Sequence, residues 1–381
     1  KHSDRYQYTL PYYNFSKDMT STIVNNEIGG SLNFFSAGTN KLSNTNNLRT
    51  TIVNDLNYSS KDLISSLGFK NNFFLYFKNL NVVGKNDSLY TSNLQIDGMN
   101  TLMINSSYPL LKYNDEVKET LTPKVSFRIN PINNMNNYSD SERVVTANNV
   151  FDINRLGISN DFEAGKSLTF GLNYKYDPLS DNQSEDIKND LFKDTNQDFS
   201  EIPKNKHLEI KLATVIRDEN ESNIPFSSTL NRKNSNLFGS IENKLFENVD
   251  LLYEFSLDND MRTINSNSIE TEISINNFVT SFNFIEQRNE IGSTHLLSNT
   301  TEYKIDNNRS LKFSTRRNKK INLTEYYDLS YEYKNDCLTA AIKFNKRFYQ
   351  DKDLKPTEDL FFSLTLIPLT TYEREIYKKT P

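Results

Sequence analysis

The strongest constraint on the fold of this chain is a two-residue alternation of apolar and polar side chains across residues 325–371. In the first run every second position is aromatic or aliphatic: Tyr327, Leu329, Tyr331 and Tyr333. The alternation resumes after Asn335-Asp336 and again after a polar loop at 350–358. Successive side chains of a β-strand point to opposite faces, so a period of two predicts strands. We expect three strands here, each with one apolar and one polar face.

The same alternation recurs along most of the chain. Further candidate strands lie at residues 6–14, 23–36, 48–58, 63–80, 99–112, 119–130, 168–176, 208–217, 237–245, 250–257, 269–275, 278–285, 295–303 and 311–316. This pattern predicts about seventeen strands and no amphipathic helix of comparable strength. The chain is therefore expected to be all-β.

Two stretches interrupt the alternation. Residues 131–166 form a long polar segment, and residues 177–205 are acidic and poor in apolar side chains. Such a composition cannot bury a core, so 177–205 is expected to be a flexible insertion. A short helix around residues 186–192 is the alternative.

Composition limits where such a sheet can lie. The 381 residues are 36% hydrophobic, the mean hydropathy is -0.68, and no apolar run approaches the roughly 18 residues of a membrane-spanning helix. A helical membrane protein is thereby excluded. A membrane β-barrel is not, because only alternate residues of its strands face lipid. A barrel can also take up residues 1–381 as one domain, although this length would suit two or three ordinary domains.

Aromatic content and loop lengths favour the membrane barrel. The chain has 21 Tyr and 25 Phe, residue types that suit strands and membrane interfaces. Short turns such as 306–309 alternate with longer loops such as 217–234, which is the asymmetry of an outer-membrane barrel. A soluble or secreted β-repeat protein would alternate in the same way and stays open as an alternative.

Nothing in the sequence predicts catalysis, a metal site or a cofactor. The three histidines, His2, His207 and His295, are far apart and fit no metal-ligand spacing. No phosphate-binding glycine loop or nucleophile motif is present, and the carboxylates are expected to be solvated in turns. The net charge of -5 comes from interspersed acidic and basic residues, so nucleic acid is not an expected partner.

Two residues carry specific implications. Cys337 is the single cysteine, so it is either a buried bystander or one half of a disulfide with a partner outside this segment. Its position at a predicted tight turn, instead of mid-strand on the apolar face, favours the disulfide. Pro368 interrupts what the pattern predicts to be the last strand, and proline removes a ladder N–H. A weakened last strand suggests a seam that opens, with Leu364, Leu366 and Pro368 as candidate gate residues; a fraying strand end is the alternative.

Several segments, taken in order, resemble the C-terminal barrel of the lipopolysaccharide-assembly protein LptD, in its alphaproteobacterial branch. They are Tyr108-Pro109-Leu110, Leu121-Thr122-Pro123-Lys124-Val125, Asn149-Val150-Phe151-Asp152-Ile153-Asn154-Arg155-Leu156, Glu163-Ala164-Gly165, Leu168-Thr169-Phe170-Gly171-Leu172, Tyr331-Glu332-Tyr333-Lys334-Asn335-Asp336-Cys337 and Asp353-Leu354-Lys355-Pro356. The resemblance extends over nearly the whole chain. It implies a large transmembrane barrel whose N-terminal periplasmic domain and first strands are not in this segment.

The resemblance also implies a function and partners. Lipopolysaccharide would arrive along a periplasmic LptA-type bridge and pass between the first and last strands into the outer leaflet, with an LptE-like lipoprotein plugging the lumen. Cys337 matches the position at which the family bonds its barrel to the periplasmic domain, although relatives often carry two adjacent cysteines where this chain has Asp336 and Cys337. The expected location is the outer membrane of a Gram-negative bacterium, in contact with its lipid, and the expected activity is not enzymatic.

Parity of the strands then assigns the loops. If residues 335–337 are periplasmic, then 350–358, 318–323, 217–234 and 131–166 are outer loops, and 177–205 is a periplasmic insertion. The alternative function is a general porin or an uptake barrel for small solutes, which would need a closed seam and an open lumen. A partial barrel leaves strand edges unpaired, so this segment is not expected to fold alone.

Overall fold

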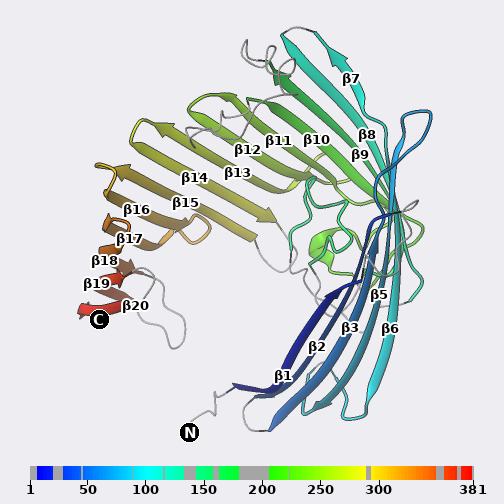
Figure 1. The fold of residues 1–381 in the computed structure, drawn as a ribbon, viewed down its shortest axis with the longest axis horizontal. Coiled ribbons are helices and arrows are strands. Elements are labelled where there is room, and N and C mark those ends of the chain that lie inside the picture. Colours follow the sequence, from blue (N-terminus) through cyan, green and yellow to red (C-terminus); the bar gives the residue numbers. More distant parts are fainter. Residues whose placement is uncertain are drawn as a thin grey trace. The chain divides into compact units, whose positions relative to one another are not determined.

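The computed structural model describes residues 7–19, 29–43, 46–88, 90–114, 116–132, 143–157, 163–179, 206–222, 224–288, 293–348, 356–366 and 370–379. Within these residues the chain forms 20 β-strands and one short 3-10 helix, η1 (Phe226–Ser228) (Figure 1). The strands whose pairing is described run antiparallel to their neighbours in the chain. The prediction of an all-β antiparallel fold is confirmed.

The strand bounds are β1 (Gln7–Asp18), β2 (Ser31–Ser43), β3 (Asn47–Ser59), β4 (Leu63–Ile64), β5 (Lys70–Lys85), β6 (Gln95–Ser107), β7 (Leu110–Tyr113), β8 (Val117–Asn130), β9 (Gly165–Pro178), β10 (Leu208–Arg217), β11 (Leu237–Phe246), β12 (Val249–Leu257), β13 (Ile264–Ile275), β14 (Phe278–Arg288), β15 (Ser293–Lys304), β16 (Arg309–Asn318), β17 (Leu323–Lys334), β18 (Leu338–Arg347), β19 (Thr357–Leu366) and β20 (Thr370–Lys379). Apart from the short β4 and β7, each has 9 to 16 residues. Strands of soluble proteins usually have 3–10 residues, so many of these are long.

The structure corrects several predicted strands. The run at 63–80 is not one strand, because a turn at Gly68, with φ +88°, separates β4 from β5. Of the strand predicted at 23–36, residues 23–28 lie outside the described residues; β2 begins at Ser31, after Gly29 and Gly30, which both have positive φ. Thr370–Lys379 was not predicted and forms β20. Asp177 and Pro178 belong to β9, while residues 180–205, with the proposed helix at 186–192, lie outside the described residues.

The chain divides into two compact units, which we describe separately. Unit 1 comprises residues 1–111, 120–174 and 211–238, and unit 2 comprises residues 112–119, 175–210 and 239–381.

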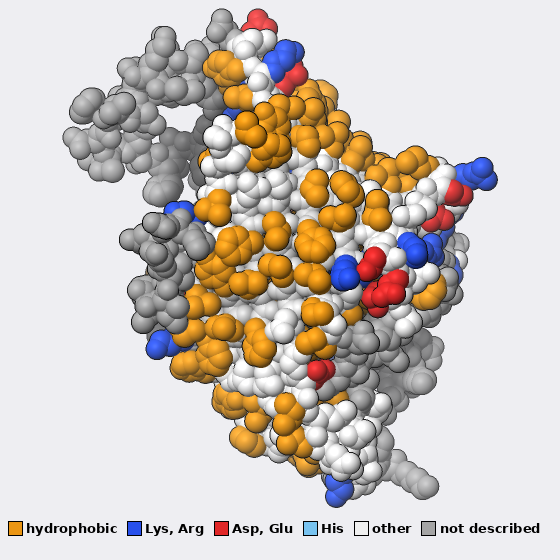
Figure 2. Space-filling view, turned by 90° about the vertical axis from the view of Figure 1, so that its right-hand side faces the viewer, with side chains coloured by type: hydrophobic (Ala, Val, Ile, Leu, Met, Phe, Trp, Pro, Cys, Tyr) orange, Lys and Arg blue, Asp and Glu red, His pale blue; other side chains and the backbone are white. Residues whose placement is uncertain are grey.

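The strands of unit 1 have an apolar and a polar face. On β8, Leu121 and Val125 are exposed on one face, while Ser126 and Arg128 are buried on the other. On β9 the exposed residues are Leu168, Phe170 and Leu172. Figure 2 shows hydrophobic side chains over much of the face seen there, with few charges among them. These large apolar side chains point away from the core and not into it.

Two chain segments cover part of the polar face of unit 1. We call residues 143–157 loop A and residues 218–236, which contain η1, loop B. Side chains of both loops join side chains of β10 and β11 in one buried cluster: Val145, Ala147, Val150, Leu156, Ala213, Val215, Ile224, Leu230 and Phe238. A hydrophobic core of this unit thus lies between its strands and two loops.

Unit 2 shows the two faces more simply. Across β12 to β19 the paired residues of one face are largely apolar, among them Leu251, Tyr253, Ile269, Ile273, Phe278, Phe282, Phe284, Leu297, Tyr303, Leu311, Phe313, Leu329, Tyr331, Ile342, Phe344, Phe362 and Leu364. The opposite face carries residues such as Glu270, Asn283, Lys312, Asp328 and Lys343. We refer to these as the apolar face and the polar face.

The connections between the strands of unit 2 fall alternately at its two ends. At the turn end, neighbouring strands are joined by short turns at 247–248, 276–277, 305–308 and 335–337. At the opposite end, the loop end, the described connections are 258–263 and 319–322. The alternation of ends agrees with the parity predicted for 318–323 and 335–337 within this unit.

Candidate functional site

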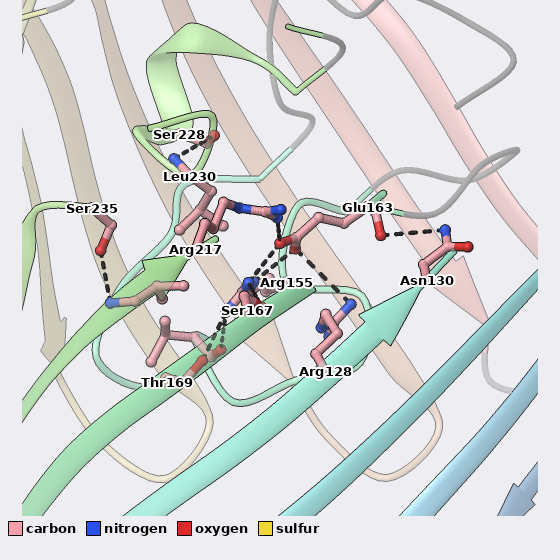
Figure 3. A network of polar contacts seen from close by, with 12 residues as sticks. Arg128, Asn130, Arg155, Glu163, Ser167, Thr169, Arg217, Ser228, Leu230 and Ser235 are labelled. Carbon is pink, nitrogen blue, oxygen red and sulfur yellow. Dashed lines mark hydrogen bonds and ion pairs between the residues drawn. The ribbon is translucent and has the colours of Figure 1, made fainter. Parts of the chain in front are cut away.

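The most strongly built polar site lies in unit 1, on the polar face beneath loop A (Figure 3). It joins Arg128 of β8, Arg217 at the end of β10, Arg155 of loop A and Glu163 just before β9. All four residues are between 1% and 4% exposed. Charged side chains are almost never buried this completely unless they are paired. We call these four residues the arginine cluster.

Arg155 makes the most complete set of contacts. Its Nε donates to Glu163 Oε2 at 2.7 Å and its Nη2 to Glu163 Oε1 at 2.5 Å, which is a two-pronged guanidinium–carboxylate pair. Its remaining donors reach the hydroxyls of Thr169 and Ser167, each at 3.0 Å, and the carbonyl of Val150 at 3.3 Å. The side chain therefore ties loop A to Glu163 and to β9.

Arg217 and Arg128 approach the same carboxylate from two other strands. Arg217 Nη2 donates to Glu163 Oε1, and Arg217 Nη1 donates to the carbonyl of Ala164 at 2.9 Å. Arg128 Nη2 donates to the carbonyl of Asp152 in loop A at 2.5 Å, and its Nη1 lies 3.9 Å from Glu163 Oε2. Glu163 is thus the common anchor of three guanidinium groups.

The charges on Glu163 determine its protonation. Burial alone would raise the pKa of Glu163, but the positive charges of Arg155 and Arg217 and the hydrogen bonds from Arg155 outweigh it and hold this pKa well below its ordinary value. Glu221 of loop B lies near Arg217, and partial burial raises the pKa of Glu221. Glu163 is therefore ionised at neutral pH and cannot act as a proton donor there.

Two glycines make room for this arrangement. Gly165 has φ +84°, and a Cβ there would lie 2.2 Å from Glu221 Oε1 and 3.0 Å from Arg217 Nη1. At Gly171 on β9, a Cβ would lie 2.6 Å from the ring of Phe151 of loop A. The positive φ makes glycine the favoured residue at 165, and a Cβ at 171 would require the Phe151 ring to move.

The arginine cluster has a structural role: its ion pairs hold loop A on the strands. Two guanidinium nitrogens, Arg128 Nη1 and Arg217 Nε, have no hydrogen-bond partner among the residues that the structure describes, so within this part of the chain the cluster is not fully satisfied. Removing one partner of a buried ion pair leaves an uncompensated charge in the interior and strongly destabilises the fold. The cluster accordingly fixes loop A against β8, β9 and β10.

The sequence prediction missed this cluster. Carboxylates were expected to be solvated in turns, which is wrong for Glu163. The sequence signal that could have drawn attention to Arg155, Glu163 and Gly165 is that all three belong to the segments that resemble LptD. Ion pairing between them depends on the inward fold of loop A, which alternation of side chains does not predict.

The predicted site residues lie elsewhere and do not come together. Cys337 lies in the predicted turn, between β17 and β18, and is exposed; its backbone N–H donates to Asn335 Oδ1 at 3.0 Å. His207 and His295 each lie 3.7 Å from one carboxylate oxygen, of Glu242 and Glu286 respectively. His2 lies outside the described residues.

The predicted gate strand is corrected by the pairing. Leu364 and Leu366 belong to β19, which pairs with β18 on one side and with β20 on the other. The last described strand is therefore β20, and β19 is not an edge strand. Pro368 lies outside the described residues.

Comparisons with known proteins give no family. No family model matches the sequence, and no curated protein matches it. Among solved structures, a ferric enterobactin receptor mutant from Pseudomonas aeruginosa is similar at TM-score 0.43 and 8% identity, over 88% of this chain and 60% of the receptor. A mutant of Rh. blastica porin is similar at TM-score 0.30 and 8% identity, over 90% of this chain and 95% of the porin. Likeness at this level decides nothing about function.

The length and pairing of the strands and the exposed apolar faces are features of outer-membrane β-barrels. Within the described residues no helix is long and apolar enough to cross a membrane.

Proposed function

We propose that this chain is the membrane-spanning β-barrel part of a protein that delivers lipopolysaccharide to the outer leaflet of the outer membrane of a Gram-negative bacterium. The observation that carries the membrane placement is the apolar face of unit 2. Its aromatic and aliphatic side chains are exposed, for example Phe282 at 43% and Ile342 at 48%. A soluble protein rarely leaves such a continuous apolar surface open to water.

The choice of lipopolysaccharide as substrate is supported by the resemblance to LptD and by where its segments fall. Arg155, Glu163 and Gly165 come from these segments, and they build the arginine cluster. Some of the residues that carry the resemblance thus form the buried ion pairs of unit 1. An LptE-like plug, an LptA-type bridge and a disulfide partner for Cys337 remain parts of this proposal.

Depletion of the full-length protein in its native cell tests the proposal. We expect newly made lipopolysaccharide to stall before the cell surface while uptake of small solutes continues. Normal surface delivery with lost uptake of solutes would overturn the proposal in favour of a porin. The polar face of unit 2, with charged residues such as Lys312 and Asp328, would suit a porin lumen as well.

A lateral path is the mechanism that this function requires. Lipid would leave between two strands whose edges separate, and the transport energy would be supplied elsewhere. Because β19 is paired on both sides, the strand that opens is proposed to be β20 and not β19.

A further inference from the structure

Four basic side chains gather at the loop end of unit 2. Arg317 lies near the end of β16, Lys319 and Lys320 lie in the turn that follows, and Lys346 lies near the end of β18. We call them the cationic rim. Arg317 pairs with Leu297 of β15, and Lys346 pairs with Tyr327 of β17; both partners belong to the apolar face. Arg317 and Lys346 therefore lie on the apolar face, at its margin.

Aromatic rings support two of these cations. Lys319 Nζ lies 5.4 Å from the ring centroid of Phe284, and Lys346 Nζ lies 5.4 Å from that of Phe348. The ring of Phe348 in turn packs edge-on against Tyr327 at 5.5 Å. Long basic side chains on aromatic rings at the margin of an apolar surface are typical of a membrane interface, where the stem lies in the apolar layer and the charge reaches the headgroups.

Most of this positive charge is not neutralised. Lys346 pairs with Glu358 at 3.2 Å, and Arg317 donates to the amide oxygen of Asn322. In the part of the chain that the structure describes, no carboxylate pairs with Arg317, Lys319 or Lys320. The rim therefore offers donors and positive charge to an anion from outside the protein.

The turn end of the same face has a different character. Tyr303 and Tyr333 are exposed there, and Arg309, the basic residue at this end of β16, is paired with Asp306. Positive charge is thus concentrated at one margin of the apolar face and not at both.

We propose that the cationic rim binds the phosphate groups of a membrane lipid, with the acyl chains lying against the apolar face. Arginine and lysine both bind phosphate groups, and the aromatic rings fix the depth of the headgroup. The inference rests on the proposed function, which supplies the lipid: the phosphorylated lipid A part of lipopolysaccharide. It also assigns the loop end of unit 2 to the outer leaflet.

Binding of fluorescent diphosphoryl lipid A to the full-length protein in detergent micelles tests this proposal. The variant is Arg317→Gln with Lys319→Gln. The control is Lys312→Gln with Lys343→Gln, which removes the same charge from the polar face. Since each basic residue near a membrane surface contributes about 1 kcal/mol, we expect the rim variant to bind about tenfold to thirtyfold more weakly and the control to bind within about twofold of the wild type.

Further binding measurements identify the source of the phosphate. Dephosphorylated lipid A should bind the wild-type protein no better than diphosphoryl lipid A binds the rim variant. Equal losses in the rim and control variants would overturn the proposal, because net charge would then explain binding. Displacement of the lipid by millimolar inorganic phosphate alone would also overturn it in favour of a free-anion site.

The outcome is separable from that of the proposed function. Unchanged lipid A binding in the rim variant, with lipopolysaccharide still stalled on depletion of the protein, would reject the rim and keep the transport function. Loss of binding in the rim variant, with normal lipopolysaccharide delivery on depletion, would keep the rim and reject the function.

Discussion

Glu163 is the single residue on which most of the buried polar structure depends. It faces Arg155, Arg217 and Arg128 at 2% side-chain exposure. Replacing it with glutamine would leave three buried guanidinium groups without their carboxylate. We expect Glu163→Gln to lower the free energy of unfolding by about 3–5 kcal/mol, the cost of breaking a buried ion pair from one side. Chemical denaturation of the full-length protein measures it.

Glu247→Gln is the matched control, because Glu247 is exposed in a turn and its described ion pair is with Lys206, which is also exposed. Little change is expected there. A loss for Glu163→Gln no larger than that for Glu247→Gln would show that the arginine cluster does not hold unit 1 together.

The same residue predicts a pH dependence. The pKa of Glu163 is lowered in the folded protein relative to its ordinary value of 4.5. A lowered folded-state pKa contributes stability above the unfolded-state value, and this stability is lost as the pH falls below it. The difference in unfolding free energy between wild type and Glu163→Gln should be constant above about pH 5.5 and shrink below about pH 4.5. A difference that grows on acidification would contradict the assignment.

Gly165 provides a steric test of the same site. A Cβ at this position would collide with Glu221 Oε1, and the φ of +84° disfavours any other residue. We expect Gly165→Ala to destabilise the protein by about 1–3 kcal/mol. Gly98→Ala on β6 is the control, since a Cβ there meets nothing within 4 Å. Similar midpoints of unfolding for the two variants would argue against tight packing of loops A and B.

At the scale of strands, the predictions succeed where burial follows the alternation. The strand predicted at residues 208–217 has the bounds of β10, and the run at 278–285 lies within β14. β20 was missed because Ile376 and Tyr377 are adjacent and Arg374 shares a side with Tyr372. β20 is defined by its pairing with β19, although its own side chains do not alternate regularly. Loop A could not be predicted either, since its contacts join residues distant in the sequence.

The two faces of β14 make the membrane placement testable. Phe282 lies on the apolar face and the adjacent Ser281 lies on the polar face. An arginine in the lipid-facing middle of a barrel strand costs about 2–4 kcal/mol. Phe282→Arg should therefore reduce assembly of the full-length protein in the outer membrane, whereas Ser281→Arg should assemble nearly normally, as scored by heat-modifiable migration in gels. Equal assembly of both variants would mean that this face does not contact lipid.

At the scale of the whole molecule, the remaining question is which way unit 2 points across the membrane. β16 runs from the turn at 305–308 to the turn at 319–322, so residues Asn307 and Lys320 mark its opposite ends. The proposed function places the turn end, with Cys337, in the periplasm and the loop end at the cell surface. An accessible cysteine at each end therefore reports the orientation of the strand.

In a Cys337→Ser background, Lys320→Cys should react with a membrane-impermeant maleimide in intact cells, and Asn307→Cys should react only after the outer membrane is permeabilised. The opposite pattern would place the cationic rim in the periplasm, away from the outer-leaflet phosphates that it is proposed to bind. Labelling of both cysteines in intact cells would instead mean that β16 does not cross the membrane. Because the two residues flank the same strand, β16, the comparison of their labelling depends on no other part of the molecule.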